Sequence, residues 1–256
     1  MHRLPLFVCL FLCTLSFAQK AGTTYTDDQG ATVPEANATY KTVTTTLSDT
    51  AYTVEYFDAK SNRKLSTETH NTTTNMDSYV YYEEGTISAK QYYTNALPSG
   101  QWTRYEKGKP VATLNYDAAT AYYTAQVAEN AKSATVEPTI TVSKPSAGDT
   151  NAGKFTAAEF SGGNFISYFS DQLFVNDHLS EALQESGFNN QKIIIRFTID
   201  TKGVPTDIDI RNCLNPEFQI EIMRVILSAP KWKPAYRGTV AVQDSKVIPF
   251  TFKFEE

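Results

Sequence analysis

The side chains that commonly perform catalysis or bind metals are sparse in this sequence. Of the three histidines, His70 and His178 lie far apart in the chain, with no cysteine or paired carboxylate at metal-ligand spacing. Gly162-Gly163 is not followed by the Gly-Lys-Ser/Thr of a phosphate-binding loop. Asp207 and Asp209 alternate on one strand face, which is typical of the solvated side of a sheet. The sequence therefore predicts no enzyme, no cofactor and no metal.

Backbone groups offer a different chemistry, and the last predicted strand, 247–254, presents them. Its even positions carry Ile248, Phe250, Phe252 and Phe254 and are expected to face the core, while the odd positions face away. Pro249 has no N–H, so this strand should lie at a sheet edge or contain a bulge. An edge strand can pair with an incoming peptide through its free N–H and C=O groups.

Aromatic residues of the N-terminal half form a second candidate surface. Tyr81, Tyr92, Tyr93 and Trp102 are candidates for a binding face. Cross-strand packing is the alternative explanation, because aromatic pairs stabilise neighbouring strands.

The C-terminal hundred residues have the order strand, strand, helix, strand. Ile193, Ile195, Phe197 and Ile199 alternate with Ile194, Arg196 and Thr198, the period of a strand with one buried face. Asp200 to Gly203 form a turn, and 204–211 form a second strand. Asn215 and Pro216 begin a helix whose polar face is expected to be opposite its apolar one. The polar face consists of Glu217, Glu221, Arg224 and Ser228. The pattern predicts an α+β domain, a small antiparallel sheet with helices on one face.

Helical spacing also precedes these strands. Phe165, Tyr168, Phe169 and Leu173 predict one short helix, and a second is expected from about Asp177 to Ser186, ending at Gly187.

Several motifs in this region resemble the C-terminal domain of the TonB family, over about residues 155–256. They are Phe160-Ser-Gly-Gly163, Phe197-Thr-Ile-Asp-Thr-Lys-Gly-Val204, Pro230-Lys-Trp-Lys-Pro-Ala235, Gly238 and Val247-Ile-Pro-Phe-Thr-Phe252. Ser161 stands where many relatives have proline, and Phe174-Val-Asn176 stands where they often have Tyr-Pro.

The resemblance implies a docking function. In the TonB family this domain pairs with a short periplasmic segment of an outer-membrane transporter and transmits energy from an inner-membrane motor. Carried over by position, the peptide-binding strand would be Val247 to Lys253. Its candidate contact residues are Val247, Ile248, Pro249, Thr251 and Lys253. The chain lacks a convincing membrane anchor and a long Pro-rich spacer, so docking is expected rather than full energy transduction.

A repeat organises the N-terminal half, from about Thr42 to Tyr116. Gly85 and Gly108 are 23 residues apart, each in a Tyr-Glu-x-Gly turn, and 56–63 is a degenerate earlier copy. Ser99-Gly-Gln-Trp102 is expected to supply the turn between units. These units resemble MORN repeats and imply an all-β meander of hairpins.

Segments of low apolar periodicity flank this repeat. Residues 19–41 are expected to form a loose leader, and 117–154, rich in Ala, Thr, Ser, Pro and Gly, to be a linker in which 118–132 could form a frayed helix. A linker of this kind predicts that the two domains unfold independently.

The first 18 residues resemble a secretory signal peptide. Arg3 precedes an apolar core from Leu6 to Leu15, and Ser16-Phe-Ala18 is a small-x-small cleavage site. Cleavage would leave Cys213 as the one cysteine, either half-buried or free to pair between chains in a homodimer. The sequence therefore predicts a periplasmic or cell-envelope protein. An uncleaved inner-membrane anchor is the alternative.

The composition excludes one class of partner and leaves two functional hypotheses. The net charge is −5 and no Lys/Arg cluster is present, unlike in nucleic-acid-binding proteins. The first hypothesis is an envelope protein that binds TonB-dependent transporters by strand addition. The second is a structural interaction module that binds envelope proteins or glycan without a transporter.

Overall fold

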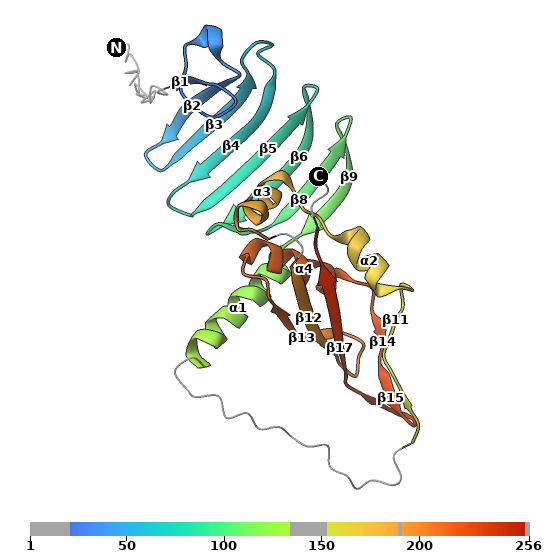
Figure 1. The fold of residues 1–256 in the computed structure, drawn as a ribbon. Coiled ribbons are helices and arrows are strands. Elements are labelled where there is room, and N and C mark those ends of the chain that lie inside the picture. Colours follow the sequence, from blue (N-terminus) through green and yellow to red (C-terminus); the bar gives the residue numbers. More distant parts are fainter. Residues whose placement is uncertain (1–20, 134–152, 189–190, 254–256) are drawn as a thin grey trace, which may run out of the picture.

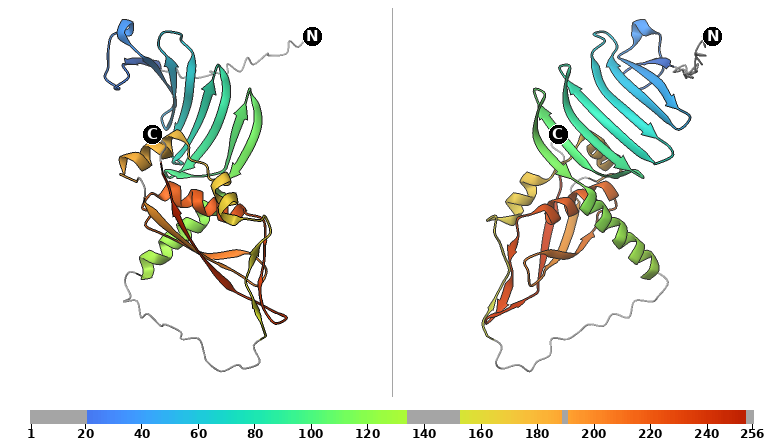
Figure 2. Two further views of the ribbon diagram at one scale, coloured as in Figure 1. Left: turned by 45° about the vertical axis from the view of Figure 1, so that its right-hand side comes forward. Right: turned by 180° about the vertical axis from the view of Figure 1, so that it is seen from behind.

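The computed structural model describes residues 21–133, 153–188 and 191–253 of the 256-residue chain. It combines helices with antiparallel sheets, as the sequence predicts. Figures 1 and 2 show a curved sheet from the N-terminal half standing on the helices and short strands of the C-terminal half. The predicted signal peptide lies outside the described residues.

Nine strands of the N-terminal half form one sheet in the order β1-β2-β3-β4-β5-β6-β8-β9, with β7 paired to β6. They are β1 (Ala21–Thr26), β2 (Tyr40–Ser48), β3 (Ala51–Asp58), β4 (Lys64–Asn71), β5 (Met76–Glu83), β6 (Thr86–Thr94), β7 (Leu97–Pro98), β8 (Gln101–Glu106) and β9 (Lys109–Asn115). A 3-10 turn, η1 (Glu35–Asn37), separates β1 from β2. The prediction of a loose leader over residues 19–41 is therefore wrong for its described part, because β1 pairs with β2 along its whole length.

The 23-residue repeat appears in the hairpins as well as in the sequence. Gly85 and Gly108 have φ of 79° and 75°, in the left-handed region that tight hairpin turns require. Each hairpin also contains one extra residue in its second strand, at Leu65, Ser88 and Val111. These bulges are 23 residues apart (65, 88 and 111), so the degenerate first copy keeps the geometry of the other two.

The connection between repeat units differs from the expected one. The chain reverses after β6 at Asn95 and Ala96, both with positive φ, rather than at Ser99 to Trp102. Gly100, with φ of 62°, then redirects the chain into β8. An Asn at a left-handed position explains the turn, because its short polar side chain tolerates that conformation.

The meander is a single layer over much of its width. Strand β4 is half-buried at all eight positions, so neither of its faces is packed on a core. A row of ring contacts crosses the strands instead, with neighbouring centroids 4.3–6.2 Å apart. The row consists of Tyr52, His70, Tyr79, Tyr93, Trp102 and Tyr116.

The described residues of the C-terminal half form three small antiparallel sheets and three helices, with a further helix, α1 (Asp117–Ser133), leading into it. The helices are α2 (Phe165–Gln172), α3 (Asp177–Glu185) and α4 (Pro216–Ser228). The strands are β10 (Phe155–Thr156), β11 (Glu159–Phe160), β12 (Lys192–Ile199), β13 (Pro205–Arg211), β14 (Trp232–Lys233), β15 (Ala235–Arg237), β16 (Val240–Val242) and β17 (Asp244–Thr251). The sheets are ordered β13-β12-β17, β10-β15-β16 and β11-β14.

Local signals in this half act as the sequence predicts. The Asn215 side chain accepts a hydrogen bond from the Phe218 N–H at the start of α4. Gly203, with φ of 80°, lies so close to β14 that a Cβ there would be 2.0 Å from the carbonyl oxygen of Trp232. A side chain at residue 203 would therefore meet both a strained φ and a backbone clash.

The expected linker begins with a helix that packs on the C-terminal half. Helix α1 lies against α4, and its Tyr122 and Gln126 contact the backbone of Ile208 in β13. Residues 117–133 are therefore a structural element and not a spacer. The remainder of the predicted linker, up to residue 152, lies outside the described residues.

Three of the four residues of the predicted polar face of α4 are buried, whereas Ser228 is exposed. Glu217, Glu221 and Arg224 are 9%, 1% and 4% exposed. Tyr93 of β6 and Tyr116 each donate a hydrogen bond of 2.8 Å to one of the two carboxylates. Helix α4 thus faces the C-terminal sheet on one side and the meander on the other.

One hydrophobic core joins the two halves. It includes Trp102 and Tyr116 from the meander side together with Phe218 and Ile222 from α4. The Trp102 ring contacts Phe174 in the connection between α2 and α3 at 6.4 Å. We therefore expect coupled unfolding of the two halves, in place of the independent unfolding that a flexible linker implies.

Truncating either of two core rings should destabilise the protein strongly. Phe197 is 1% and Trp232 7% exposed, and their ring centroids are 5.8 Å apart. Loss of a large buried aromatic side chain costs about 3–5 kcal/mol. We expect Phe197→Ala or Trp232→Ala to lower the unfolding midpoint in urea accordingly. Melts unchanged from wild type would show that these rings do not support the core.

Removing a single hydroxyl should test the coupling between the halves. Tyr116→Phe leaves the ring in place but takes one donor from the buried Glu221 carboxylate. We expect a loss of about 1–3 kcal/mol in one cooperative transition measured by urea unfolding. Tyr92→Phe is the matched control, because Tyr92 is 37% exposed and its loss should stay within about 0.5 kcal/mol. Two separate transitions in the wild type would contradict the shared core.

Candidate functional site

Strand β17 is the edge strand of its sheet, as the missing N–H of Pro249 predicts. It pairs antiparallel with β12 over all eight residues, from Asp244 opposite Ile199 to Thr251 opposite Lys192. Within the described residues no strand pairs with its other side. The strand begins three residues earlier than the predicted Val247, and Phe254 lies outside the described residues.

The side chains of β17 alternate as predicted. Ile248 and Phe250 are half-buried and pack against the core, whereas Val247, Pro249 and Thr251 are exposed. Four of the five candidate contact residues thus lie in the edge strand, but the side chain of Ile248 faces the core and, by the alternation of the ladder, its backbone groups face β12. Lys253 is exposed but lies two residues beyond the end of β17.

The register indicates which backbone groups face the open edge. Pro249 lies opposite Ile194. Because proline cannot donate to the ladder, its nitrogen is expected to point away from β12, and residues of the same parity share its direction. Val247 and Thr251 should then present their N–H and C=O groups to an incoming strand.

The opposite edge of the same sheet is closed by α1. The Ile208 N–H donates to the Tyr122 hydroxyl oxygen at 2.8 Å, and the Gln126 side-chain amide donates to the Ile208 carbonyl at 2.8 Å. The N–H and the C=O of Ile208, near the middle of β13, are therefore both bound by side chains of α1. Among the described residues, the edge of β17 has no such side-chain cover over its central backbone groups.

A charged cluster that the sequence analysis missed fixes the start of β17. The Lys246 Nζ donates to the Asp244 carboxylate and to the Ala158 carbonyl, both at 2.8 Å. The same carboxylate accepts the Ala158 N–H at 2.8 Å. The opposite charges of Asp244 and Lys246 were the available signal in the sequence. Their common partner, Ala158, lies 86 residues before Asp244 and could not be inferred from it. These bonds tie the start of the edge strand to the segment that precedes β11.

The four aromatic candidates of the meander do not form one binding face. Tyr93 and Trp102 are buried, at 6% and 3% exposed, between the meander and the C-terminal half. Tyr81 is half-buried, and Tyr92 lies on the opposite face of β6 from Tyr93. Packing therefore explains Tyr93 and Trp102, as the alternative interpretation states.

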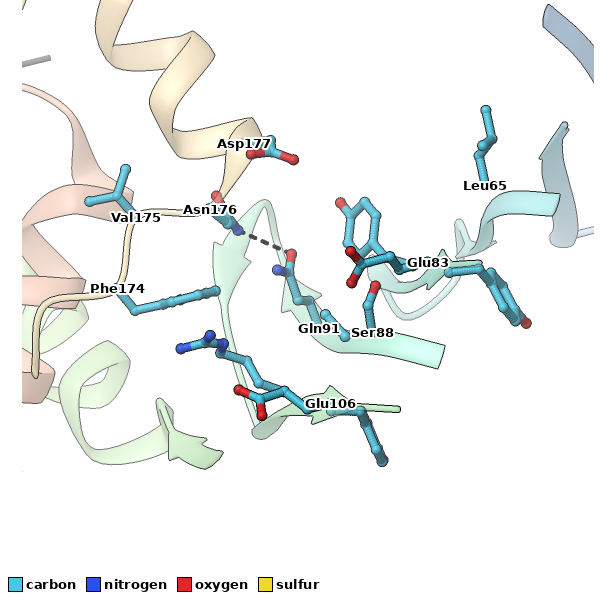
Figure 3. A pocket seen from close by; sticks show the side chains of 14 residues that line it. Leu65, Glu83, Ser88, Gln91, Glu106, Phe174, Val175, Asn176 and Asp177 are labelled. Atoms are coloured by element: carbon cyan, nitrogen blue, oxygen red, sulfur yellow. Dashed lines mark hydrogen bonds between the residues drawn. The ribbon is translucent and has the colours of Figure 1, made fainter. Parts of the chain in front are cut away.

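A cleft opens beside this interface (Figure 3). It has a volume of about 560 Å³ and lies between the meander strands and the connection from α2 to α3. Phe174 and Asn176 reach from that connection toward Gln91 of β6, and the Asn176 amide donates to the Gln91 side-chain oxygen at 3.1 Å. No sequence motif marks this cleft, because its two walls are far apart in the chain.

Two clusters of titratable groups lack the geometry of a metal site. His70 lies between Asp77 at 2.8 Å and Glu68 at 3.2 Å on one face of the meander. In the described ranges no group of three or more His, Cys, Asp or Glu side chains is arranged to hold a metal ion. Asp207 is exposed and Asp209 pairs with Arg211 at 2.7 Å, so these carboxylates belong to the sheet surface.

Cys213 is more deeply buried than expected, at 3% exposed. Burial raises the pKa of its thiol to about 11, so little thiolate forms near neutral pH. A disulfide between two copies of the chain through Cys213 is therefore disfavoured, because the sulfur is buried and the thiol stays protonated.

Comparison of the chain with protein-family models, curated proteins and solved structures found no match. The resemblances to the TonB C-terminal domain and to MORN repeats rest on the motifs alone. No helix among the described residues combines the length and the apolar character needed to span a membrane.

The contact between His178 and Glu217 should make stability depend on pH. Glu217 lies 3.2 Å from the His178 Nδ1 and raises the pKa of that imidazole above its ordinary value. The protonated imidazole, paired with Glu217, therefore contributes its full stabilisation below about pH 6.5, the ordinary pKa of histidine. This stabilisation is lost as the pH rises through the raised pKa of the folded state. We expect His178→Gln to lower the melting temperature more at pH 5.5 than at pH 8.5. An equal loss at both pH values would contradict this contact.

Proposed function

We propose that this chain is an envelope protein that docks a peptide segment of a TonB-dependent outer-membrane transporter. The peptide would add as a strand to the open edge of β17. Main-chain hydrogen bonds would supply the affinity and the outward side chains the choice of partner. The exposed positions Val247, Pro249 and Thr251 would tune that choice.

The observation that carries this proposal is the asymmetry of the β13-β12-β17 sheet. Side chains of α1 occupy the edge at Ile208, while the edge at β17 has no partner among the described residues. Native proteins usually cover or blunt exposed strand edges. An edge left open beside a closed one supports a role in binding, and the motif resemblance supports a transporter peptide as the partner.

Docking, rather than energy transduction, is the function that we propose. The transporter peptide would be bound in the periplasm by an exported protein whose two halves share one core. Coupling to an inner-membrane motor forms no part of the proposal.

A structural interaction module is the second candidate function. It is favoured by the contact between the meander and α4, in which Tyr93 and Tyr116 bind Glu217 and Glu221. A meander held in this way presents a fixed surface and could bind an envelope component without a transporter. Peptide binding at β17 distinguishes the two candidates.

Blocking one backbone donor should test the edge. Thr251→Pro removes an N–H that is expected to face the partner strand, while the core side chains of β17 stay in place. We expect binding of synthetic transporter N-terminal peptides, measured by titration calorimetry on the full mature chain, to weaken at least about tenfold, or about 1.4 kcal/mol. Thr251→Ala keeps the N–H and should bind within about twofold of wild type.

Two outcomes would contradict the proposal. A wild-type protein that binds none of these peptides would favour the structural module. A Thr251→Pro variant that loses its fold, seen as a lowered melting temperature, would show that this N–H bonds to β12 and that the edge is not open there.

A further inference from the structure

We propose that the cleft between the meander and the α2–α3 connection binds a short saccharide without acidic groups. The inference concerns a different site from the β17 edge and does not depend on transporter docking. It rests on the shape of the cleft, its unpartnered polar side chains and its aromatic rings (Figure 3).

The walls of the cleft are held in a fixed relation. One wall consists of β5, β6 and β8 with Leu65 of β4, and the other of residues Phe174 to Asp177. The Phe174 N–H donates to the buried Glu221 at 2.6 Å, and Asn176 donates to Gln91. Asn176 also caps α3 through the Leu179 N–H at 2.7 Å. A volume of about 560 Å³ between fixed walls is in the range of small-ligand sites, which are usually preformed.

The strand side of the cleft contains a local gap in the sheet. Strands β6 and β8 pair only at Ala89–Arg104 and Lys90–Thr103. Toward the hairpin turns no further pair joins these two strands, and each hairpin has a bulge there, at Ser88 and Val111. Ser88 and Glu106, next to this gap in the pairing, line the cleft.

Polar side chains converge on the cleft without partners. In the described part of the chain, eight polar lining side chains make no hydrogen bond or ion pair with one another or with other residues. They are Tyr81, Tyr82, Glu83, Ser88, Arg104, Tyr105, Glu106 and Asp177. The Arg104 guanidinium is held over the Phe174 ring, 5.6 Å from its centroid, so it faces the cleft through a cation–π contact.

The mixture of groups selects the ligand class. Three carboxylates accept hydrogen bonds, one guanidinium donates, and the Ser88 and Tyr81 hydroxyls do both. Sugar hydroxyls also donate and accept, and the apolar face of a sugar ring can lie against an aromatic ring such as Phe174 or Tyr105. An anionic ligand would meet three carboxylates against one guanidinium, and an apolar ligand would leave the polar groups unpaired.

The test measures saccharide binding by the full mature chain with saturation-transfer NMR and calorimetry. The probes are chitotetraose, cellotetraose and maltotetraose, with tetragalacturonate and a tetralysine peptide as charged competitors. We expect at least one neutral tetrasaccharide to bind, and Arg104→Gln or Asp177→Asn to weaken that binding at least about tenfold. Arg63→Gln and Asp171→Asn are the matched controls outside the cleft and should leave binding unchanged.

Each of three results would overturn the proposal. These are no binding of any neutral probe, binding that survives both cleft variants, and preferential binding of tetragalacturonate or tetralysine. Melting temperatures equal to wild type confirm that the cleft variants remain folded. Thr251→Pro should leave saccharide binding unchanged, so failure at the edge strand and failure at the cleft can be told apart.

Discussion

The structure depends on the buried carboxylate of Glu221. It accepts hydrogen bonds from the Tyr116 hydroxyl, the Phe174 N–H and two nitrogens of Arg224, at 2.6–2.8 Å. Breaking a buried ion pair by removing one partner typically costs about 3–5 kcal/mol, because a charge is left uncompensated. These bonds draw together the end of the meander, the connection after α2 and helix α4. The carboxylate therefore fixes three segments that no single sheet or helix contains.

This anchoring explains how a largely single-layer sheet can be stable. The strands far from α4 are half-buried and gain little from a core of their own. Cross-strand ring contacts instead connect Tyr52 through Tyr93 to Trp102, and Trp102 belongs to the common core. Glu217 repeats the role of Glu221 one turn earlier by accepting the Tyr93 hydroxyl. The meander is thus supported at one end by α4, and the same contact places Phe174 and Asn176 at the cleft.

Period and capping signals were sufficient to predict most elements, whereas contacts between distant segments were not predictable from them. The alternation of Ile193 to Ile199, the Asn215 cap and the hairpins at Gly85 and Gly108 depend on neighbours within a few residues. The burial of Glu221 depends on Tyr116, 105 residues away. A polar helix face next to water and one paired across an interface have the same sequence pattern. For that reason the edge at β17 was predictable and the cleft beside Gln91 was not.

The two edges of the C-terminal sheet show the same difference between local signals and contacts of distant segments. Proline signals an edge locally, because a missing N–H cannot support a central strand, and Pro249 marks β17 in this way. The other edge, at Ile208 of β13, is covered by Tyr122 and Gln126 of α1. This helix lies in the segment that the composition predicts to be a linker. Since α1 also packs on α4, the helix that closes β13 is tied to the element that supports the meander. In the described part of the chain the edge of β17 is left without a partner strand, and a proline within it limits the partners that can pair there without a gap in the ladder.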